Sequence, residues 1–353
     1  MFEFFFKFLK NLSKKKEEAF GTGLIEDPRI TEEKEKDYKA EELLAAFVPI
    51  TWVEKPESEW RKFPIFNQDG SSSCVAQATS KALGIENYLE EKKFVHFSAR
   101  DIYARRSNFP GQGMWFQDGL NIAYNYGATV EQLMPSQNMN ESLMNSAEDR
   151  TPLTELVAKI GKGGNYITLP IDIEAIASLI EPSGKPVLIG VRFGPNEWNR
   201  PVPQILGTDT RWGHAICATN ATLYQGKKSL VVEDSWGTES GLQGRRILTE
   251  DWFNAKRIVF AGYITFLKNE GIEVKPKYQF LRDLKYGMVY DADVKKLQEC
   301  LAYLKLFPTR DYFTGNFYGL TLKGVKAFQV LNDIPITGIV EIQTRTKLNG
   351  IFQ

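Results

Sequence analysis

The spacing of apolar residues changes its character near residue 160, and this change limits the folds open to the chain. Before this point the pattern favours helices, as in residues 75–89, where apolar side chains recur at helical spacing. After it, short apolar runs such as 187–193 and 229–236 indicate buried strands. Helices in one half and strands in the other predict an α+β fold in two halves.

A polar stretch that contains Gly and Pro, residues 268–280, interrupts this pattern, and we interpret it as a linker. Beyond it, Asp291 or Asp293 is placed to cap a helix. A last short helix is expected to end at Leu348. The apolar stripes of the two longer helices are Val294, Leu297, Leu301 and Leu304, and then Leu322, Val325 and Phe328. The sequence therefore predicts a small three-helix bundle at this end.

The N-terminal residues differ in character from the rest of the chain. A helix over residues 2–12 would place Phe2, Phe5, Phe6, Leu9 and Leu12 on one face. Such a helix either docks on a membrane surface or a partner protein, or packs on its own protein, and both interpretations stay open. Charges break its apolar run and no small-residue cleavage site follows, so it fits a secretory signal peptide poorly.

These features divide the 353 residues into four segments, which is within the range expected for two or three domains. We expect a helix and charged arm at 1–45, a main domain at 46–267, the linker at 268–279 and a C-terminal module at 280–353. Lysine plus arginine equal aspartate plus glutamate at 44 each. This balance argues against nucleic acid as a partner.

The cysteine and histidine counts restrict the chemistry. Three cysteines without a C-x-x-C pair are too few for a disulfide framework and do not indicate zinc. With only two histidines, His96 and His214, a histidine-rich metal site is nearly excluded. We therefore expect no metal and no cofactor, and the odd number of cysteines points to a single reactive thiol.

Cys74 lies where a reactive thiol is expected. Ser and Gly cluster in residues 70–73, directly before it, and a helical pattern begins at the cysteine itself. The positive end of a helix dipole lowers the pKa of a thiol and favours the thiolate. An isolated cysteine is more often a small buried hydrophobic residue, and we interpret Cys217 and Cys300 in that way.

A nucleophilic thiolate works with a base that moves protons, usually a histidine. His214 lies in an apolar segment typical of a strand, and Asp234 ends another such run twenty residues later. Asp234 can therefore hold the second ring nitrogen of His214. Gln68 lies six residues before Cys74 and can donate its amide to an oxyanion beside the Cys74 backbone N–H. His96 has no partner motif, so we expect a structural or surface role for it.

The order Gln-x5-Cys, Gly-His-Ala and Asp-Ser-Trp-Gly in these segments resembles the papain family of cysteine peptidases. The stretch 111–129 is similar to that family's glycine-containing substrate strand, followed by a helix and a glycine turn. The resemblance covers approximately residues 50–267. It implies a papain-like fold with one helical subdomain and one β-sheet subdomain.

The resemblance also implies roles for individual residues. Gln68 would be the oxyanion glutamine, Cys74 the nucleophile, His214 the base, and Asp234 the residue at the position usually held by asparagine. Trp236 would shield the His–Asp contact from water. Gly111 and Gly113 would lie along the substrate, although the sequence does not decide which of the two pairs with its backbone.

Two departures from the family pattern have physical consequences. Ser71 to Val75, Ser-Ser-Ser-Cys-Val, stand where the family usually has Cys-Gly-Ser-Cys-Trp, so the usual disulfide partner near the nucleophile is missing. Asp234 in place of asparagine adds a negative charge, which should raise the pKa of His214 and stabilise its imidazolium.

The C-terminal pattern resembles the peptidoglycan-binding domain found on many wall hydrolases. The resemblance rests on Asp293-Val294, Leu297-Gln298, Thr314-Gly315, Phe317, Thr321, Val325, Phe328-Gln329, Thr337-Gly338 and Thr344. It implies peptidoglycan or another wall polymer as the partner of residues 280–353. Candidates for sugar stacking are Tyr312, Phe317 and Tyr318, although such aromatics are more often core residues. Eleven Lys/Arg against seven Asp/Glu between residues 277 and 353 also suit an anionic polymer.

The sequence thus predicts a thiol peptidase that cuts wall peptides or wall-associated protein, at the cell envelope, outside the cell or on a virion. One alternative is a processing protease that the C-terminal module merely anchors. Another is a structural or attachment protein of a cell surface or virion, with an unused peptidase fold. The first fifty residues are also open to interpretation as a pro-segment, although they show no clear motif of one.

Overall fold

The computed structural model describes residues 23–29, 34, 49–159, 161–265, 275–307 and 313–353. The predicted N-terminal helix at 2–12 and most of the charged arm lie outside these residues. No helix in the described part of the chain is long and apolar enough to cross a membrane.

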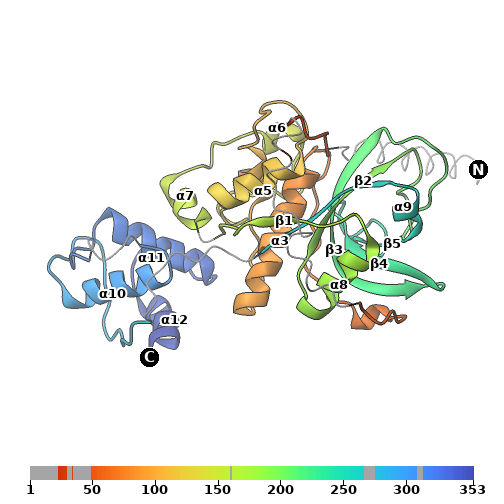
Figure 1. Ribbon diagram of the computed structural model, residues 1–353. Helices are drawn as coiled ribbons and strands as arrows, with labels where there is room; N and C mark the ends of the chain where they lie inside the picture. The colour runs from red at the N-terminus through yellow and green to blue at the C-terminus, as the bar shows by residue number, and fades with distance from the viewer. Residues whose placement is uncertain (1–22, 30–33, 35–48, 160, 266–274, 308–312) are drawn as a thin grey trace, which may run out of the picture.

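The first half is helical, as the apolar spacing predicts. It contains α3 (Cys74–Glu91), α4 (Ala99–Tyr103), α5 (Phe116–Asn125), α6 (Glu141–Met144) and α7 (Pro152–Ala158), with a short 3₁₀ turn, η2 (Glu57–Glu59), before them. The long helix α3 is buried along most of its length because it lies between the other helices and the sheet (Figure 1). It ends where Lys92 takes a left-handed conformation at φ 57°.

The second half is a six-stranded antiparallel sheet in the order β1-β6-β2-β3-β4-β5. Its strands are β1 (Tyr166–Thr168), β2 (Val187–Phe193), β3 (Trp212–Tyr224), β4 (Lys227–Glu233), β5 (Arg245–Thr249) and β6 (Ile258–Ile264). Two helices accompany them, α8 (Ile173–Ser183) and α9 (Asp251–Asn254). The predicted strand at 187–193 matches β2, whereas the one predicted for 229–236 ends earlier, at Glu233. The α+β prediction is confirmed.

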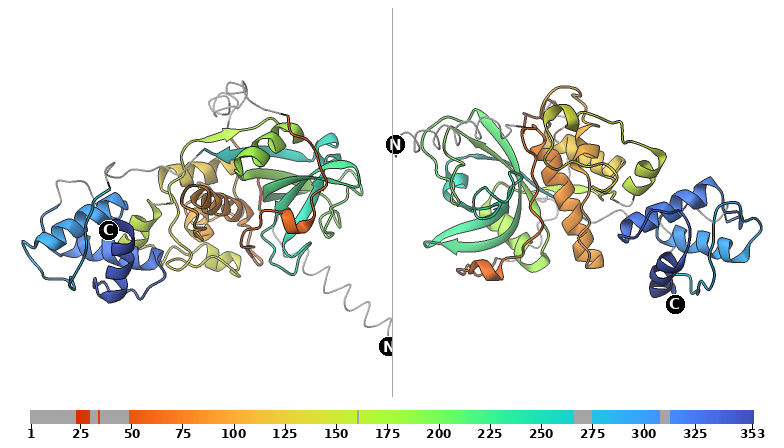
Figure 2. Two further views of the ribbon diagram at one scale, coloured as in Figure 1. Left: turned by 90° about the horizontal axis from the view of Figure 1, so that it is seen from below. Right: turned by 180° about the vertical axis from the view of Figure 1, so that it is seen from behind.

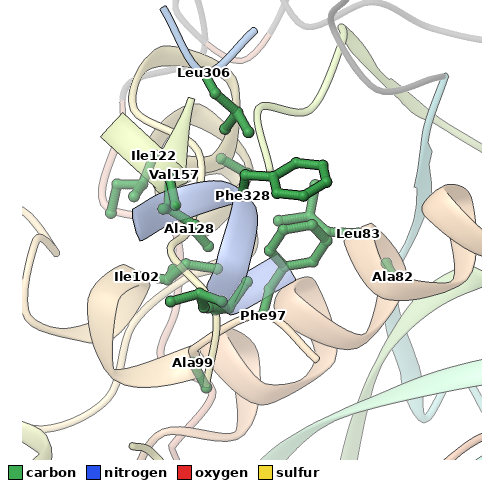
Figure 3. Packing of buried hydrophobic residues seen from close by; sticks show 14 of the residues in the cluster. Ala82, Leu83, Phe97, Ala99, Ile102, Ile122, Ala128, Val157, Leu306 and Phe328 are labelled. Atoms are coloured by element: carbon green, nitrogen blue, oxygen red, sulfur yellow. The ribbon is translucent and has the colours of Figure 1, made fainter. Parts of the chain in front are cut away.

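Two apolar cores hold these layers together. One lies between α3 and its neighbouring helices, and Figure 3 shows Leu83, Phe97 and Ile102 of this core together with Val157 of α7. The other fills the sheet side around Ile176, Leu230 and Trp252. Because α3 contacts β2, β3 and β6, its N-terminus is placed against the middle of the sheet.

The C-terminal module consists of α10 (Ala292–Tyr303), α11 (Gly319–Leu331) and α12 (Ile342–Phe352). Asp291 is the helix cap, since its Oδ1 accepts the N–H groups of Asp293 and Val294. The last helix runs to Phe352, four residues beyond the predicted end. Phe352 is buried and contacts the ring of Tyr303, which accounts for this extra turn.

Two buried glutamines organise the turns of this bundle in the same way. The Oε1 of Gln298 accepts the N–H of Gly315, and the Oε1 of Gln329 accepts the N–H of Gly338. Each glutamine also donates to a threonine at the start of the next helix, at 3.0 Å for Thr321 and 2.9 Å for Thr344. These residues therefore maintain the fold rather than form a ligand surface.

The bundle packs on the helical half, on the side away from the sheet, through α11 and α7 (Figure 2). Gln132 Nε2 donates to Asp333 Oδ1 at 2.8 Å across this contact. The described end of the predicted linker packs on the module, since the N–H of Tyr278 donates to Phe352 O and Phe280 is buried. The boundaries of the predicted segments stay predictions.

Candidate active site

The thiol of Cys74 lies at the first residue of α3, where the sequence predicts a helix start. The side chain is fully buried. Ser73, the residue before it, has its hydroxyl 2.8 Å from that of Ser71, so the serine run forms a compact turn under the helix end. The sulfur therefore lies at the end of the helix where the first N–H groups are unpaired and the dipole is positive.

His214 lies on β3 and links Cys74 to Asp234. Its Nε2 is 2.7 Å from Asp234 Oδ1, and its side chain is fully buried. The other ring nitrogen, Nδ1, is buried without a hydrogen-bond partner among the described residues, and Cys74 is near enough to contribute to the pKa of the ring. Burial lowers the pKa of His214, but Asp234 and Cys74 outweigh this effect and raise that pKa to about 9. The imidazolium form is therefore favoured at neutral pH.

Asp234 follows the last residue of β4 and is held by four donors. Its Oδ1 accepts from His214 and, at 2.7 Å, from the N–H of Ser235. Its Oδ2 accepts from Trp198 Nε1 at 2.9 Å and Arg246 Nε at 2.7 Å. Burial raises the pKa of this carboxyl, but His214 and Arg246 outweigh it and hold the pKa well below its usual range. Asp234 is thus an ionised, immobile acceptor.

Sequence reasoning missed Trp198 and Arg246. A signal for Arg246 exists, since Arg245 and Arg246 stand together at the start of an apolar run and buried arginines need carboxylate partners. Which carboxylate each one meets depends on how β4 and β5 pair, and that pairing is not readable from the sequence.

Trp236 covers the histidine, as the family resemblance implies. Its ring centroid lies 4.9 Å from that of His214 with the planes tilted by 37°, and it is 8% exposed. Trp198 approaches the same imidazole edge-on at 6.1 Å. The two indoles keep water away from the contact between His214 and Asp234.

Gln68 is buried, and both ends of its amide are anchored. Its Oε1 accepts the hydroxyl of Ser235 at 2.6 Å, and its Nε2 donates to Ser71 O at 2.6 Å. A side-chain amide has two N–H groups, so one remains for a further acceptor. Since Ser235 also contacts Asp234, Gln68 is fixed to the same framework as the Cys74–His214 pair.

A stretch of the chain's own backbone, Gly23 to Ile25, lies against this site in an extended form. Its backbone hydrogen-bonds on one side to Met114 and on the other to Gly213. The N–H of Leu24 donates to Gly213 O at 3.2 Å, Met114 N–H donates to Gly23 O at 2.9 Å, and Ile25 N–H donates to Met114 O at 3.2 Å. Leu24 and Met114 are paired in the parallel sense. Gly213 directly precedes His214, so the segment passes beside the histidine.

Of the two predicted substrate glycines, the structure brings only Gly113 to this segment. It has φ +75°, and a Cβ there would come within 2.6 Å of Gly23 O. Gly111 is exposed, and its carbonyl accepts two hydrogen bonds from Arg106. The Gly111 backbone therefore stabilises a turn, and its place along a substrate stays a prediction. Met114, which the sequence did not single out, makes the backbone contacts.

The remaining cysteines and the second histidine lie elsewhere. Cys217 and Cys300 are buried, and burial raises the pKa of each thiol. His96 stacks on Phe66 with ring centroids 4.2 Å apart, and burial together with Lys81 lowers its pKa to about 4. No group of three or more metal-binding side chains occurs among the described residues.

The predicted sugar-stacking residues of the C-terminal module differ in their exposure to solvent. Phe317 is fully buried and so is a core residue, which corrects its assignment as a sugar-stacking candidate. Tyr312 lies outside the described residues. Tyr318 is 48% exposed and lies edge-on to Tyr286, which is 61% exposed, with ring centroids 6.0 Å apart. The exposed aromatic pair is therefore Tyr286 and Tyr318.

Comparisons with known proteins agree with both parts of this architecture. Residues 290–348 match the family model described as "Putative peptidoglycan binding domain". No curated protein matches the sequence. Among solved structures, the chain is similar to xylellain, a cysteine protease from Xylella fastidiosa, with a TM-score of 0.57 and 17% identity over 71% of this chain and 97% of that one.

It is also similar to the digestive procathepsin L2 proteinase of the Tenebrio molitor larval midgut. This match has a TM-score of 0.53 and 17% identity, and it covers 71% of this chain and 80% of that one. The predicted papain-like fold is therefore confirmed, and the C-terminal bundle is of the predicted type.

Proposed function

We propose that this papain-fold chain is a thiol peptidase in which Cys74 attacks the substrate carbonyl and His214 moves the protons. The observation that carries the proposal is the orientation of His214, whose Nε2 lies 2.7 Å from Asp234 Oδ1 while Nδ1 makes no hydrogen bond among the described residues and Cys74 adds to the rise in the ring's pKa. A histidine oriented in this way can stabilise a thiolate and later protonate a leaving amine.

The reaction then follows from these positions. The Cys74 thiolate adds to the peptide carbonyl carbon, and the oxygen takes the negative charge. The backbone N–H of Cys74 and the second N–H of Gln68 Nε2 stabilise that charge. The His214 imidazolium gives its proton to the leaving amine, which departs and leaves a thioester. His214 then takes a proton from water, the hydroxide attacks the thioester, and the acid and the thiolate are released.

The extended conformation of residues 23–25 beside His214 supports a peptide as the substrate. An extended main chain occupies the space beside His214 and is held by backbone groups of Met114 and Gly213. The Leu24 side chain is 5% exposed, and a Cβ on Gly190 would come within 3.0 Å of its Cδ2, so this glycine leaves room for it. We therefore expect the site to accept an extended peptide with an apolar side chain at this position.

The same contacts indicate a latent form. A substrate backbone cannot pair with Met114 and Gly213 while the chain's own segment does so. Its parallel pairing with Met114 fixes the direction in which it crosses the site. Residues 23–25 therefore act as an internal competitor that must leave before substrate binds, which favours the pro-segment interpretation of the N-terminal residues over a docking arm.

We propose that residues 280–353 direct the peptidase to bacterial wall polymer. The family match at 290–348 supports this, and so does the excess of basic residues in the module. Tyr286 and Tyr318 offer two neighbouring exposed rings, edge-on to each other, and an exposed aromatic ring suits the apolar face of a sugar. The substrate would then be a wall peptide or a wall-associated protein, cut at the envelope.

The alternatives make different demands on the site. A structural or attachment protein has no need for a buried carboxylate, histidine and thiol in contact, so this arrangement favours the enzyme. A processing protease that is only anchored by its module would differ from the proposed wall-directed peptidase in its substrate, and its mechanism would be the same.

A hydrolysis assay tests the proposed function. The full chain is incubated with purified wall peptides and with an unfolded protein, and new amino termini are counted. Loss of all cleavage in Cys74→Ala, with cleavage retained in Cys300→Ala, supports the proposal. Equal cleavage by both variants would refute it.

A further inference from the structure

Arg246 occupies a position next to the reacting groups that no family resemblance assigns to it. Its Nε donates to Asp234 Oδ2 at 2.7 Å, and its guanidinium is 1% exposed. Its two Nη groups donate to Arg200 O at 2.9 Å and Ser240 Oγ at 2.6 Å. Its rigid fork is thus held at three points, and its position relative to Asp234 is fixed.

The charges of this buried site balance only when Arg246 is counted. A carboxylate, a thiolate and an imidazolium would leave one uncompensated negative charge away from water, which is unfavourable. Arg246 supplies the missing positive charge. With a neutral asparagine in place of Asp234, the thiolate and the imidazolium would balance without an arginine. Asp234 and Arg246 together therefore carry the same net charge as that one neutral side chain.

The other charged groups near the site are already paired with one another. Glu233 directly precedes Asp234, and its carboxylate binds Lys81 at 2.9 Å and Arg245 at 3.1 Å. These three groups sum to one positive charge, and in the described part of the chain none of their side chains makes a hydrogen bond or ion pair with His214 or Asp234. The groups that face the imidazole are therefore Asp234 and Cys74, with Arg246 acting through Asp234.

We infer that Arg246 is a positioning residue, which holds Asp234 in place and offsets part of its charge, and so sets the protonation range of His214. For Cys74 chemistry this rests on the proposed function, but the coupling of Arg246 to His214 does not. The positive charge of Arg246 opposes a proton on His214, so it moderates the rise in the His214 pKa that Asp234 alone would cause. Replacing Asp234 removes the attraction and leaves that repulsion.

Titration of His214 in the full chain tests this inference without any substrate. With only two histidines in the sequence, His96 and His214, the imidazole signals can be assigned with a His96→Gln variant. We expect Arg246→Gln to raise the pKa of His214 by about one unit and Asp234→Asn to lower it by one or more. The double variant should lie between Asp234→Asn and the wild type.

Arg245→Gln is a matched control, because Arg245 is the neighbouring buried arginine of β5 and pairs with the neighbouring carboxylate, Glu233. Arg245→Gln should lower the stability of the fold and leave the pKa of His214 unchanged. Arg246→Lys, which keeps the charge, should keep the His214 pKa within about half a unit of wild type. Equal His214 titration in wild type and Arg246→Gln would overturn the inference, whether or not the protein cleaves peptides.

If Arg246→Gln does not fold, a second comparison decides. Asp234→Asn leaves Arg246 as a buried charge without its partner, and adding Arg246→Gln removes that charge. The double variant should therefore have a higher melting temperature and a higher His214 pKa than Asp234→Asn alone. A double variant that is lower in both would overturn the inference.

Discussion

The Nε2 of His214 lies 2.7 Å from Oδ1 of Asp234, and neither side chain is exposed to solvent. The contact fixes the orientation of the imidazole and leaves Nδ1 for the Cys74 sulfur. It also explains how a fully buried histidine retains a pKa above its ordinary value, since the carboxylate outweighs the effect of burial. The first prediction follows from this electrostatic balance.

Asp234→Asn should move the upper pH limit of activity to a lower pH. The raised pKa of His214, about 9, means that the imidazolium persists as pH rises and is lost only near that value. Without the carboxylate, its loss should begin one or more pH units lower. The rate of peptide hydrolysis measured from pH 5 to 10 gives this limb directly, because departure of the amine needs the imidazolium. An unchanged alkaline limb would contradict the role assigned to Asp234.

Gln68→Ala should lower kcat by about 10²- to 10³-fold with little change in KM, because it removes one donor to the oxyanion. Gln68 also anchors Ser71 and Ser235, so a loss of stability is expected as well. Ser235→Ala is the control, since it removes only the partner of Gln68 Oε1. A larger loss of kcat in Ser235→Ala than in Gln68→Ala would argue against the oxyanion role.

Leu24→Asp should activate the peptidase. Burial of a leucine side chain contributes about 1.5–3 kcal/mol, and loss of that contribution shifts the segment toward its released state by about 10-fold or more. The initial rate of peptide hydrolysis should rise accordingly. The exposed neighbour Glu26 serves as the control, and Glu26→Ala should leave the rate as it is. A rate unchanged or reduced in Leu24→Asp would mean that the segment does not compete with substrate.

Tyr286→Ala and Tyr318→Ala should each reduce retention of the full chain on insoluble peptidoglycan, and the double variant should reduce it further. Stacking on a sugar face needs an exposed ring, and these two rings are 61% and 48% exposed. The control is Tyr126→Ala, a half-exposed tyrosine of the helical half that contacts Arg105. Retention unaffected by both substitutions would place the wall contact elsewhere.

The sequence is sufficient for the elements that depend on local pattern. The helical spacing after Cys74 and the apolar run at 187–193 predict α3 and β2 because burial on a helix or strand leaves a periodic trace. The pairing of His214 with Asp234 is predictable for a related reason. Each residue lies in or directly after an apolar strand, and a catalytic imidazole needs an acceptor for its second nitrogen.

Features that depend on distant contacts were not predictable. Arg246 reaches Asp234 because Arg246 pairs with Val232 across β4 and β5, and no periodicity encodes that register. The segment around Leu24 makes two backbone hydrogen bonds with Met114 and one with Gly213, and backbone contacts leave no side-chain pattern. Phe317 and Tyr318 are consecutive aromatics in one turn, and only the packed bundle decides that the first is core and the second exposed.

The most direct test of the central claim is covalent labelling of the full chain with a thiol-reactive epoxide at pH 7, followed by mass spectrometric mapping. Cys217 and Cys300 are internal controls, because the pKa of each thiol is raised by burial and neither lies beside a histidine in the described structure. The account predicts modification at Cys74 alone, accelerated by Leu24→Asp and abolished by His214→Ala. Equal labelling of all three cysteines, or labelling of Cys74 that does not depend on His214, would contradict it.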